Sequence, residues 1–302
     1  MVDIFLSVLG IYVFIAVGYA AKQTFKEKID ERTVTLLSVY FLQLFLTFWG
    51  LLKRPFDTSL ILAPALYLLI VFLTLVITAP LIRALFKEQK ERSIATVAAL
   101  IGNTGNLGIP LGIAIFGEAS IPYTTVINLV NVFFVYTFGV YYYSRGSFDV
   151  RTSIANIFKL PAIWAAFIAI GLNLWGYVPS KTVEQTLMMG AYTSMTIQLL
   201  LFGIYLYGVK LSEMNRMLIG WVNGVKFLLL PLLAFGILSL VAMDSMVKGI
   251  LFLELMMPLA VANVNLAALY ECKARDVTAL IFITSLLFLI LIFGGIKIIA
   301  YM

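Results

Sequence analysis

The chain has 302 residues, of which 62% are hydrophobic and only 12% are charged, whereas soluble domains carry roughly 25% charged residues. This composition is that of an integral membrane protein. The absence of histidine and the single cysteine, Cys272, exclude an internal disulfide and a cysteine metal cluster and remove the commonest catalytic base and metal ligand. The net charge of +6 does not indicate a nucleic-acid partner, because an excess of Lys and Arg in cytoplasmic loops accounts for it.

Ten apolar windows are long enough to cross a bilayer, which takes about 20 helical residues. Eight windows of eighteen or more residues contain no formal charge: 4–21, 33–52, 58–82, 93–117, 119–144, 160–180, 185–209 and 277–296. Two more carry one charge each, Lys226 in 217–243 and Glu254 in 249–270. We therefore predict an all-α membrane protein of ten transmembrane helices, and we interpret the first window as a membrane span rather than a signal peptide.

The distribution of Lys and Arg between alternate loops predicts the orientation. If the N-terminus is outside, the cytoplasmic loops are 22–32, 83–92, 145–159, 210–216 and 273–276. These loops carry fifteen cations: Lys22, Lys26, Lys28, Arg32, Arg83, Lys87, Lys90, Arg92, Arg145, Arg151, Lys159, Lys210, Arg216, Lys273 and Arg275. The opposite side carries five: Lys53, Arg54, Lys181, Lys248 and Lys297. The positive-inside rule then places both termini on the outer side of the membrane.

The ten helices divide into two sets of five that match in order. The pairs are Phe14–Gly18 with Phe167–Gly171, Thr33-Val34 with Thr182-Val183, Pro80 with Pro231, and Pro110 with Pro258, at offsets of 148 to 153 residues. Because five is odd, the second copy enters the membrane upside down. We predict two inverted five-helix repeats, 1–147 and 148–302, a plan that recurs among secondary transporters.

The fourth window is interrupted by IGNTGNLGIPLG at 101–112. Pro110 has no N–H, so the carbonyl of Asn106 loses its helical partner, and glycines such as Gly105 loosen the helix further. Such a break is tolerated in a membrane only where protein or water lines it. A half-helix N-terminus there attracts anions, and the carboxamides of Asn103 and Asn106 can donate to a substrate oxygen.

The ninth window carries a matching break, ELMMPLAVANVN at 254–265, with Pro258, Asn263 and Asn265. If the repeat holds, the two breaks cross near the bilayer midplane, and that crossing is the predicted substrate site. A glycine-rich membrane segment is otherwise typical of a close-packed helix interface. The paired prolines and asparagines favour a substrate site over that alternative.

Lys226 and Glu254 are the formal charges that lie deep within predicted spans, where a charge is expensive and is a functional candidate by default. They could neutralise each other as a structural pair, or they could set charge balance or carry coupling. In a chain without histidine, Glu254 is the best proton carrier at membrane depth, because burial favours the protonated form of a carboxyl group. Lys226 could instead offset an anionic substrate or replace a bound sodium ion.

Other polar side chains at membrane depth are weaker candidates. Asn128 and Asn131 share one face of the fifth helix, directly after the break, and could line the site. Gln43 and Gln198, in the second and seventh windows, could line the path or hydrogen-bond between helices, and we favour the hydrogen bond.

The segment ALIGNTGNLGIPLGIAIFGE at 99–118 resembles the signature fourth helix of the auxin efflux carrier family. KFLLLPLLA at 226–234 and MMPLAVANVNLAALY at 256–270 resemble its eighth and ninth helices, in order. The resemblance implies two inverted repeats, a scaffold domain of helices one, two, six and seven, and a transport domain of helices three to five and eight to ten. It also implies crossover prolines at Pro110 and Pro258, substrate contact by an asparagine before Pro110, elevator-like transport of organic anions, and dimerisation through the scaffold.

The short central loop at 145–159 resembles that of microbial members, which are associated with carboxylates such as malate or malonate. Many relatives carry a proline in helices two and seven. This chain reads YFLQLFLTFW at 40–49 and TSMTIQLLLFG at 193–203, so neither the kinks of those helices nor the substrate can be carried over.

The sequence thus predicts a secondary transporter of a small organic anion, such as a dicarboxylate or an auxin-like acid, with no cofactor and with coupling to H⁺ or Na⁺ left open. A cation/proton antiporter using Glu254 and Lys226 is the rival within the same fold, and a non-transporting membrane receptor is the rival in another class. An intramembrane enzyme is disfavoured by the absence of histidine and of a pair of buried aspartates.

Overall fold

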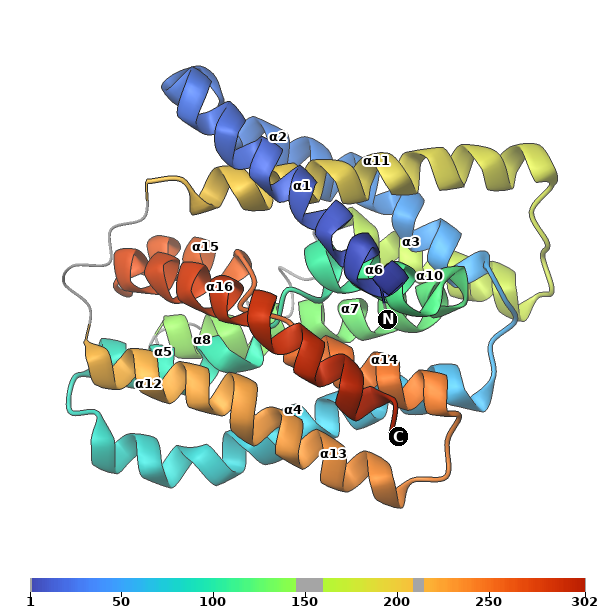
Figure 1. Ribbon diagram of the computed structural model, residues 1–302. Coiled ribbons are helices and arrows are strands. Elements are labelled where there is room, and N and C mark those ends of the chain that lie inside the picture. Colours follow the sequence, from blue (N-terminus) through green and yellow to red (C-terminus); the bar gives the residue numbers. More distant parts are fainter. Residues whose placement is uncertain (1, 145–159, 209–214, 302) are drawn as a thin grey trace.

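The computed structural model describes residues 2–144, 160–208 and 215–301, and this part of the chain is helical apart from turns and one isolated backbone bridge (Figure 1). Six helical stretches in it are long and apolar enough to cross a membrane: Glu31–Leu52, Thr58–Leu85, Glu118–Tyr143, Lys181–Leu206, Arg216–Leu240 and Ala274–Ile299. Thr104–Phe116 and Pro161–Leu174 are shorter apolar helices. The predicted loop 145–159 and most of the loop 210–216, with Arg145, Arg151, Lys159 and Lys210, lie outside the described residues.

Six of the ten predicted windows coincide with these six long apolar stretches, and the fourth and sixth windows contain the two shorter helices. The first half contains α1 (Val2–Phe25), α2 (Glu31–Leu37), α3 (Gln43–Leu52), α4 (Thr58–Leu85), α5 (Gln89–Val97), α6 (Ile109–Phe116), α7 (Ile121–Phe134) and α8 (Val140–Tyr143). The second half contains α10 (Pro161–Leu174), α11 (Lys181–Leu206), α12 (Arg216–Gly224), α13 (Leu230–Leu240), α14 (Ser245–Met256), α15 (Ala262–Leu269) and α16 (Ala274–Ile299). Non-α segments interrupt the helices between α5 and α6 and between α14 and α15, in the two windows where the sequence predicts helix breaks.

Polar side chains at the predicted helix boundaries cap the first turns. Asp57 accepts a hydrogen bond from the backbone N–H of Leu60 at the start of α4. Asp244 does the same for Met246 at the start of α14, and Asn215 for Met217 at the start of α12. These caps satisfy backbone donors that have no partner within the helix, and so they fix where each helix begins.

One helix is shorter than the sequence predicts. The window 160–180 suggested a full span, but α10 ends at Leu174, because Gly176 adopts a left-handed conformation (φ +77°) and stops the helix. The backbone N–H of Gly176 donates to the carbonyl of Asn173 over 2.9 Å. The Asn173 side chain in turn donates to the carbonyls of Leu51 and Arg54, both at 2.7 Å, and ties the end of α10 to the end of α3.

Four π-helical turns interrupt the regular helices: Ser38–Leu42 between α2 and α3, Thr104–Gly108 before α6, Val135–Gly139 between α7 and α8, and Val225–Leu229 between α12 and α13. A π turn inserts an extra residue and widens the helix locally, and such turns are frequent at functional sites. The second predicted span, 33–52, contains no proline, but it still departs from α geometry at Ser38–Leu42.

The helices pack as two groups. In one, α1 and α3 pack against α11, and α3 also packs against α10. The crossing of α1 and α11 is close, because Gly18 lies on the backbone of Leu200 and Gly203 lies on the backbone of Ile15. In the other group, α4 packs against α7 and α13, and α16 packs against α14 and α15. Figure 1 shows α1, α2 and α11 on one side of the molecule and α4, α12 and α13 on the opposite side.

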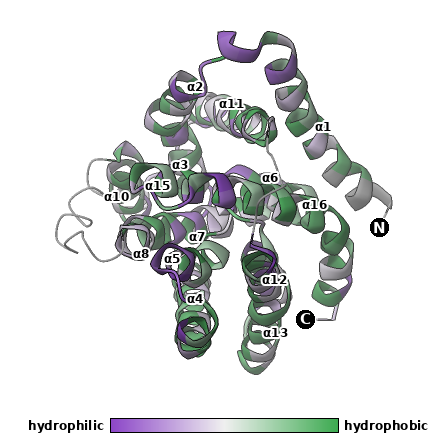
Figure 2. Cartoon of the chain, turned by 90° about the vertical axis from the view of Figure 1, so that its left-hand side faces the viewer, coloured by the Kyte–Doolittle hydropathy of each residue, from purple (hydrophilic) through white to green (hydrophobic). Residues whose placement is uncertain are grey.

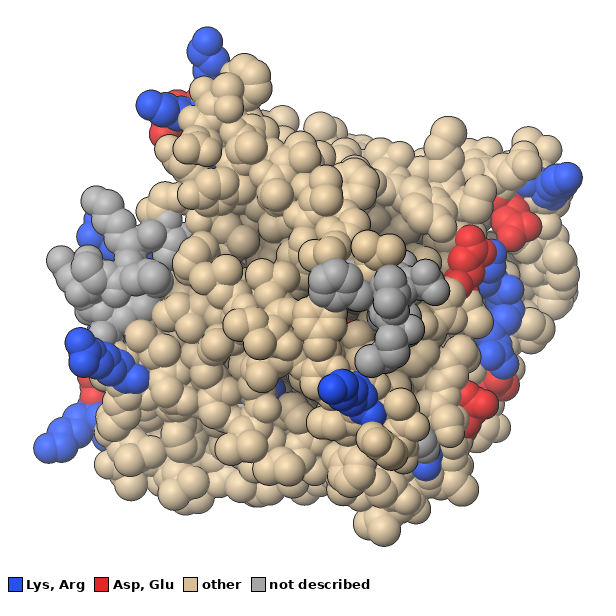
Figure 3. All heavy atoms as spheres, in the orientation of Figure 1, with Lys and Arg blue, Asp and Glu red and all other residues tan. Residues whose placement is uncertain are grey.

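The outer surface is apolar between two polar ends. Hydrophobic residues dominate the helices, and hydrophilic residues gather near α5, the start of α12 and the turn between α1 and α2 (Figure 2). Figure 3 shows charged side chains at opposite edges of the molecule. At one end Lys273 Nζ lies 2.6 Å from a Glu88 oxygen and 3.0 Å from a Glu91 oxygen, and at the other Lys53 lies 2.7 Å from Glu118. This pattern suits a chain embedded in lipid.

Candidate substrate site

The two helix breaks, at 101–103 and 257–261, cross and form hydrogen bonds with each other through their backbones. The N–H of Asn103 donates to the carbonyl of Pro258 over 2.8 Å, and the N–H of Ala260 donates to the carbonyl of Ile101 over 3.0 Å. These two bonds form an antiparallel bridge between Gly102 and Leu259. Backbone groups that the helices release at the breaks therefore find partners in each other, as a low-dielectric interior requires.

Two asparagines complete the pairing of the broken backbone. Asn131 donates to the carbonyl of Gly102 and to the hydroxyl of Thr104, both at 2.9 Å. Asn263 donates to the carbonyl of Ile101 at 3.1 Å and accepts a hydrogen bond from Tyr143 at 2.9 Å. Asn263 is fully buried and does not line the cavity described below, and its hydrogen bonds hold the crossing together.

The half-helix α6 begins directly after the first break. The carbonyl of Asn103 accepts hydrogen bonds from the N–H groups of Leu107 (3.2 Å) and Gly108 (3.0 Å), which closes the π turn. Pro110 then lies directly after the π turn, within a helix that runs without interruption from Thr104 to Phe116. The start of this helix at Thr104 is buried in the protein, and the helix dipole favours negative charge there.

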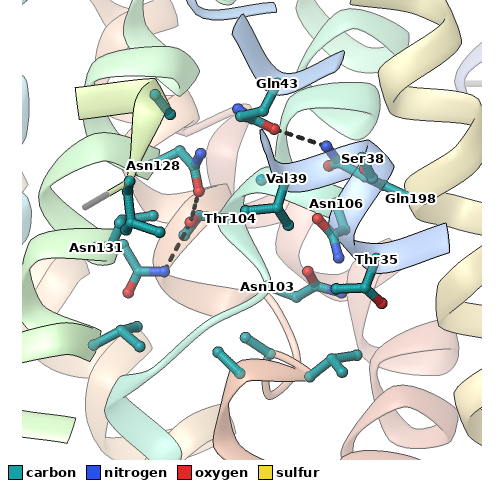
Figure 4. A pocket seen from close by; sticks show the side chains of 18 of the residues that line it. Thr35, Ser38, Val39, Gln43, Asn103, Thr104, Asn106, Asn128, Asn131 and Gln198 are labelled. Carbon is teal, nitrogen blue, oxygen red and sulfur yellow. Dashed lines mark hydrogen bonds between the residues drawn. The ribbon is translucent and has the colours of Figure 1, made fainter. Parts of the chain in front are cut away.

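A cavity of about 290 Å³ lies beside the crossing. Six of the residues that the sequence assigned to the substrate site line it: Asn103, Gly105, Asn106, Asn128, Asn131 and Asn265. Pro110 and Pro258 are buried at the crossing, and neither they nor Asn263 line the cavity. Figure 4 shows the asparagines of the first break facing the polar side chains of α2, α3 and α11.

The opposite wall of the cavity comes from the first group of helices. Thr35 of α2, Ser38 of the adjoining π turn and Gln43 of α3 face Gln198 of α11 (Figure 4). Gln198 donates to Gln43 over 2.7 Å, so these two glutamines form the hydrogen bond that the sequence favoured and also line the cavity. The cavity therefore lies between the two groups of helices.

Several polar atoms at the cavity have no hydrogen-bond partner among the described residues. They are the amide nitrogen of Asn103, the hydroxyl of Ser38 and the side-chain oxygen of Gln198. All three residues are at most 3% exposed. An unpaired buried polar group costs about 1–3 kcal/mol, so a ligand that offers both an acceptor and a donor gains affinity here.

The described lining contains no Lys, Arg, Asp or Glu. Besides its amide and hydroxyl groups it is aliphatic and aromatic, with Val39, Leu129, Ile163, Tyr136 and Tyr205 among its members. A charged group of a ligand would therefore meet amide donors and helix ends rather than a fixed counter-ion.

Lys226 and Glu254 contact the first break but are not among the residues that line the cavity. Lys226 is 1% exposed and Glu254 is 0% exposed. The Lys226 ammonium lies against Gly102, 3.1 Å from the place that a Cβ would occupy, and the Glu254 carboxylate occupies the space that a side chain at Gly108 would need. Among the ion pairs of the described residues none joins Lys226 to Glu254, and neither carboxylate oxygen has a hydrogen-bond partner there.

Sequence reasoning did not identify Thr35, Ser38, Thr104 and Tyr205 as lining residues. The Thr104 hydroxyl donates a hydrogen bond to the Asn128 side chain over 2.9 Å. Thr104 lies within the IGNTGNLGIPLG segment, so the sequence could have identified it as a site residue. Thr35 and Ser38 are three residues apart and share a helix face, but they lie near the end of a window where polar residues are common. Only the folded arrangement turns that face toward the break.

Comparison with known proteins places these features in a family. The model of a family described as membrane transport protein matches residues 3–294 of the chain. An uncharacterised transporter of Methanocaldococcus jannaschii is 26% identical over 216 residues, which cover 68% of this chain and 68% of the relative. An uncharacterised transporter of Methanothermobacter thermautotrophicus is 24% identical over 197 residues, which cover 65% of this chain and 64% of the relative.

Proposed function

The chain belongs to the membrane transport protein family, in agreement with its resemblance to auxin efflux carriers. From this membership we propose that the protein is a secondary active transporter of a small organic anion. The family and the two relatives indicate a membrane transporter rather than an enzyme. The observation that carries the proposal is the cavity beside the crossed breaks, with unpaired amide and hydroxyl groups in its wall.

The chemistry of the lining supports a monocarboxylate over a dicarboxylate. The Asn103 amide and the start of α6 suit one carboxylate, since both offer positive charge density. A second carboxylate would face a described lining without a cationic side chain. The unpaired Gln198 oxygen accepts a hydrogen bond, so the preferred substrate also carries a hydroxyl or N–H donor.

For the whole chain we propose ten transmembrane helices in two inverted repeats, 1–147 and 148–302. The paired breaks after α5 and α14 support this arrangement, as does their crossing. The proposed scaffold consists of α1, α2, α3, α10 and α11, and the remaining helices form the transport domain. Because the cavity lies between these groups, movement of one group along the other would expose it to each side in turn, as in an elevator. The proposed assembly is a homodimer through the scaffold in a microbial plasma membrane.

Lys226 and Glu254 are proposed to set charge balance or coupling. They contact Gly102 and Gly108 of the same break that bears Asn103 and Asn106, so a change in their charge would act on the backbone proposed to hold the substrate. The unpartnered carboxylate of Glu254 also supports the second candidate function, a cation/proton antiporter that exchanges H⁺ for a metal ion such as Na⁺.

A thermal-shift screen of the detergent-purified protein tests the proposal. Matched ligand pairs differ in one group: lactate against propionate, indole-3-acetate against 1-naphthylacetate, and malate against lactate, each in sodium and in potassium. We expect the donor-bearing monocarboxylates to raise Tm most. The Asn103→Ala and Asn106→Ala variants should lose the shift, whereas Asn223→Ala, in α12 and away from the cavity lining, should keep it.

Equal shifts in all variants would place binding elsewhere and overturn the site. Shifts caused by sodium or pH alone, and abolished by Glu254→Gln, would favour the antiporter. Flux of a stabilising ligand into proteoliposomes then separates a transporter from a receptor, because a receptor binds without flux.

A further inference from the structure

A second cavity lies between the end of α3 and the start of α11. Its volume is about 110 Å³. Its lining consists of Trp49, Leu52, Lys53, Val178, Pro179, Glu184 and Leu187. We call these residues the Lys53 pocket. Because Lys53 belongs to a loop on the predicted outer side, the Lys53 pocket is expected at that side of the membrane.

The Lys53 pocket and the substrate cavity use opposite ends of the same helices. The hydroxyls of Thr35 and Tyr205 hydrogen-bond to each other over 2.9 Å. Gln43 accepts a hydrogen bond from Gln198 over 2.7 Å. These contacts show that the α2–α3 segment runs antiparallel to α11. The start of α2–α3 and the end of α11 line the substrate cavity, whereas the end of α2–α3 and the start of α11 line the Lys53 pocket.

Four residues of the Lys53 pocket are repeat counterparts of residues that line the substrate cavity. The match of Thr33 with Thr182 sets the offset between the second and seventh spans at 149 residues. The pairs at that offset, with the residue of the substrate cavity first, are Thr35 with Glu184, Ser38 with Leu187, Gln198 with Trp49, and Leu201 with Leu52. In inverted repeats, counterpart positions face opposite sides of the membrane. The Lys53 pocket therefore lies where the scaffold would meet a substrate on the outer side.

An apolar cluster lies between the Lys53 pocket and the substrate cavity along α3 and α11. It joins these two helices of the proposed scaffold to α6 and α7 of the proposed transport domain. Its buried members are Leu46, Trp49, Ile109, Ile121, Ala191 and Met195. Beside the cluster, Lys53 Nζ lies 2.7 Å from an oxygen of Glu118, just after α6, and 3.6 Å from an oxygen of Glu184 in α11. Lys53 thus links the two domains where the apolar cluster keeps them closed.

The Lys53 pocket offers an anion two groups in close proximity. One is the ammonium of Lys53, which lies 5.1 Å from the ring centre of Trp49. The other is the Trp49 indole N–H, which is buried and has no hydrogen-bond partner among the described residues. A carboxylate that replaced Glu118 here would keep Lys53 paired and would accept from the indole.

We propose that the Lys53 pocket is the scaffold wall of the substrate site when that site faces the outer side, and that it takes the carboxylate of the transported anion. This inference rests on the proposed function. Movement of the transport domain along the scaffold would take Glu118 away from Lys53. The first break would then bring the bound carboxylate into the place that Glu118 leaves.

Labelling of a buried thiol tests whether the interface opens. Ala191→Cys, in a Cys272→Ser background, places a thiol in the apolar cluster, where Ala191 is 0% exposed. In the detergent-purified chain we expect Glu118→Gln to raise the rate of labelling by a maleimide about two- to fivefold, the usual effect of losing a partly exposed ion pair. Glu31→Gln removes the ion pair with Lys22 within the scaffold and should leave the rate unchanged. An unchanged rate in Glu118→Gln would overturn the inference.

Protection of the same thiol tests the anion. The probes are lactate and indole-3-acetate, and every variant carries Glu118→Gln, so that the ion pair is already absent. We expect a probe that raises Tm also to slow the labelling of Ala191→Cys. Lys53→Gln should raise the probe concentration needed for half-protection about tenfold or more, because hydrogen bonds to charged groups are strong, and Lys53→Arg should largely preserve it.

The outcomes separate this inference from the proposed function. Protection that is equally strong in Lys53→Gln would overturn the inference and leave the proposed function standing. A rise in Tm without protection would do the same. If neither probe raises Tm, the proposed function fails and the anion site at Lys53 fails with it, whatever the labelling rates are.

Discussion

The missing side chain at Gly108 determines where the most deeply buried carboxylate can lie. The carboxylate carbon of Glu254 and one of its oxygens lie 2.7 Å from the position of an added Cβ, closer than real contacts allow. A larger residue at 108 would therefore displace Glu254 or the π turn that begins α6. This contact links the backbone of the break directly to the buried charge behind it.

We predict that Gly108→Ala destabilises the protein by about 1–3 kcal/mol, the usual effect of overpacking a buried site. The measurement is thermal unfolding in detergent. Gly236→Ala is the control, because nothing lies near its Cβ position. Glu254→Ala in the Gly108→Ala background should restore part of the loss, since it removes the clashing carboxylate. A Gly108→Ala protein as stable as the Gly236→Ala protein would contradict the contact.

At the scale of elements, the ends of broken helices are tied together by charge. Glu91 of α5 binds Lys273, which precedes α16, over 3.0 Å. Burial alone would raise the pKa of Glu91, but hydrogen bonds from Asn215 and Lys273 outweigh burial and lower the pKa below its ordinary value of 4.5. Glu91 lies in the first turn of α5, Asn215 caps α12 and Lys273 directly precedes α16, so one carboxylate with its two partners joins the starts of three helices.

The lowered pKa of Glu91 predicts a pH-dependent contribution to stability. The contribution is present above pH 4.5, the ordinary value, and is lost as the pH falls through the lower pKa of the folded chain. We expect wild type to unfold at a higher temperature than Glu91→Gln at about pH 7, and the difference to shrink as the buffer approaches about pH 4. Because Glu91 is partly exposed to solvent, the effect should be modest. A difference that grows on acidification would contradict this sign.

Helix positions could be predicted from the sequence because charges and caps delimit them, as Asp57 and Asp244 do for α4 and α14. The two breaks could be predicted because Pro, Gly and Asn mark them. The π turn at Ser38–Leu42 could not, since SVYFL contains neither Gly nor Pro, the residues that most disfavour a regular helix. Packing in the folded chain decides such turns, and with them which face of α2 and α3 lines the cavity. The early end of α10 was missed because its signal, Gly176, stands within an otherwise apolar run.

At the scale of the whole molecule, membership of the transporter family is established, and the orientation in the membrane stays a prediction. Cys272 is the single cysteine of the sequence and is buried. A Cys272→Ser variant therefore provides a cysteine-free background in which single cysteines can be introduced for labelling. We expect Lys248→Cys to react with a membrane-impermeant maleimide on intact cells, and Lys90→Cys to react only after the cells are opened. Labelling of both from outside, or the reverse pattern, would contradict the positive-inside prediction.

The bridge between Gly102 and Leu259 has a consequence for biosynthesis. It joins segments from opposite halves of the chain, so the backbone groups of Ile101 and Asn103 have no final partners until the ninth span has been made. Lipid offers no substitute for those partners. During synthesis these groups of the first half must therefore be hydrogen-bonded to water or shielded by the insertion machinery. If the two halves are expressed as separate polypeptides, we expect them to fold only when they are expressed together.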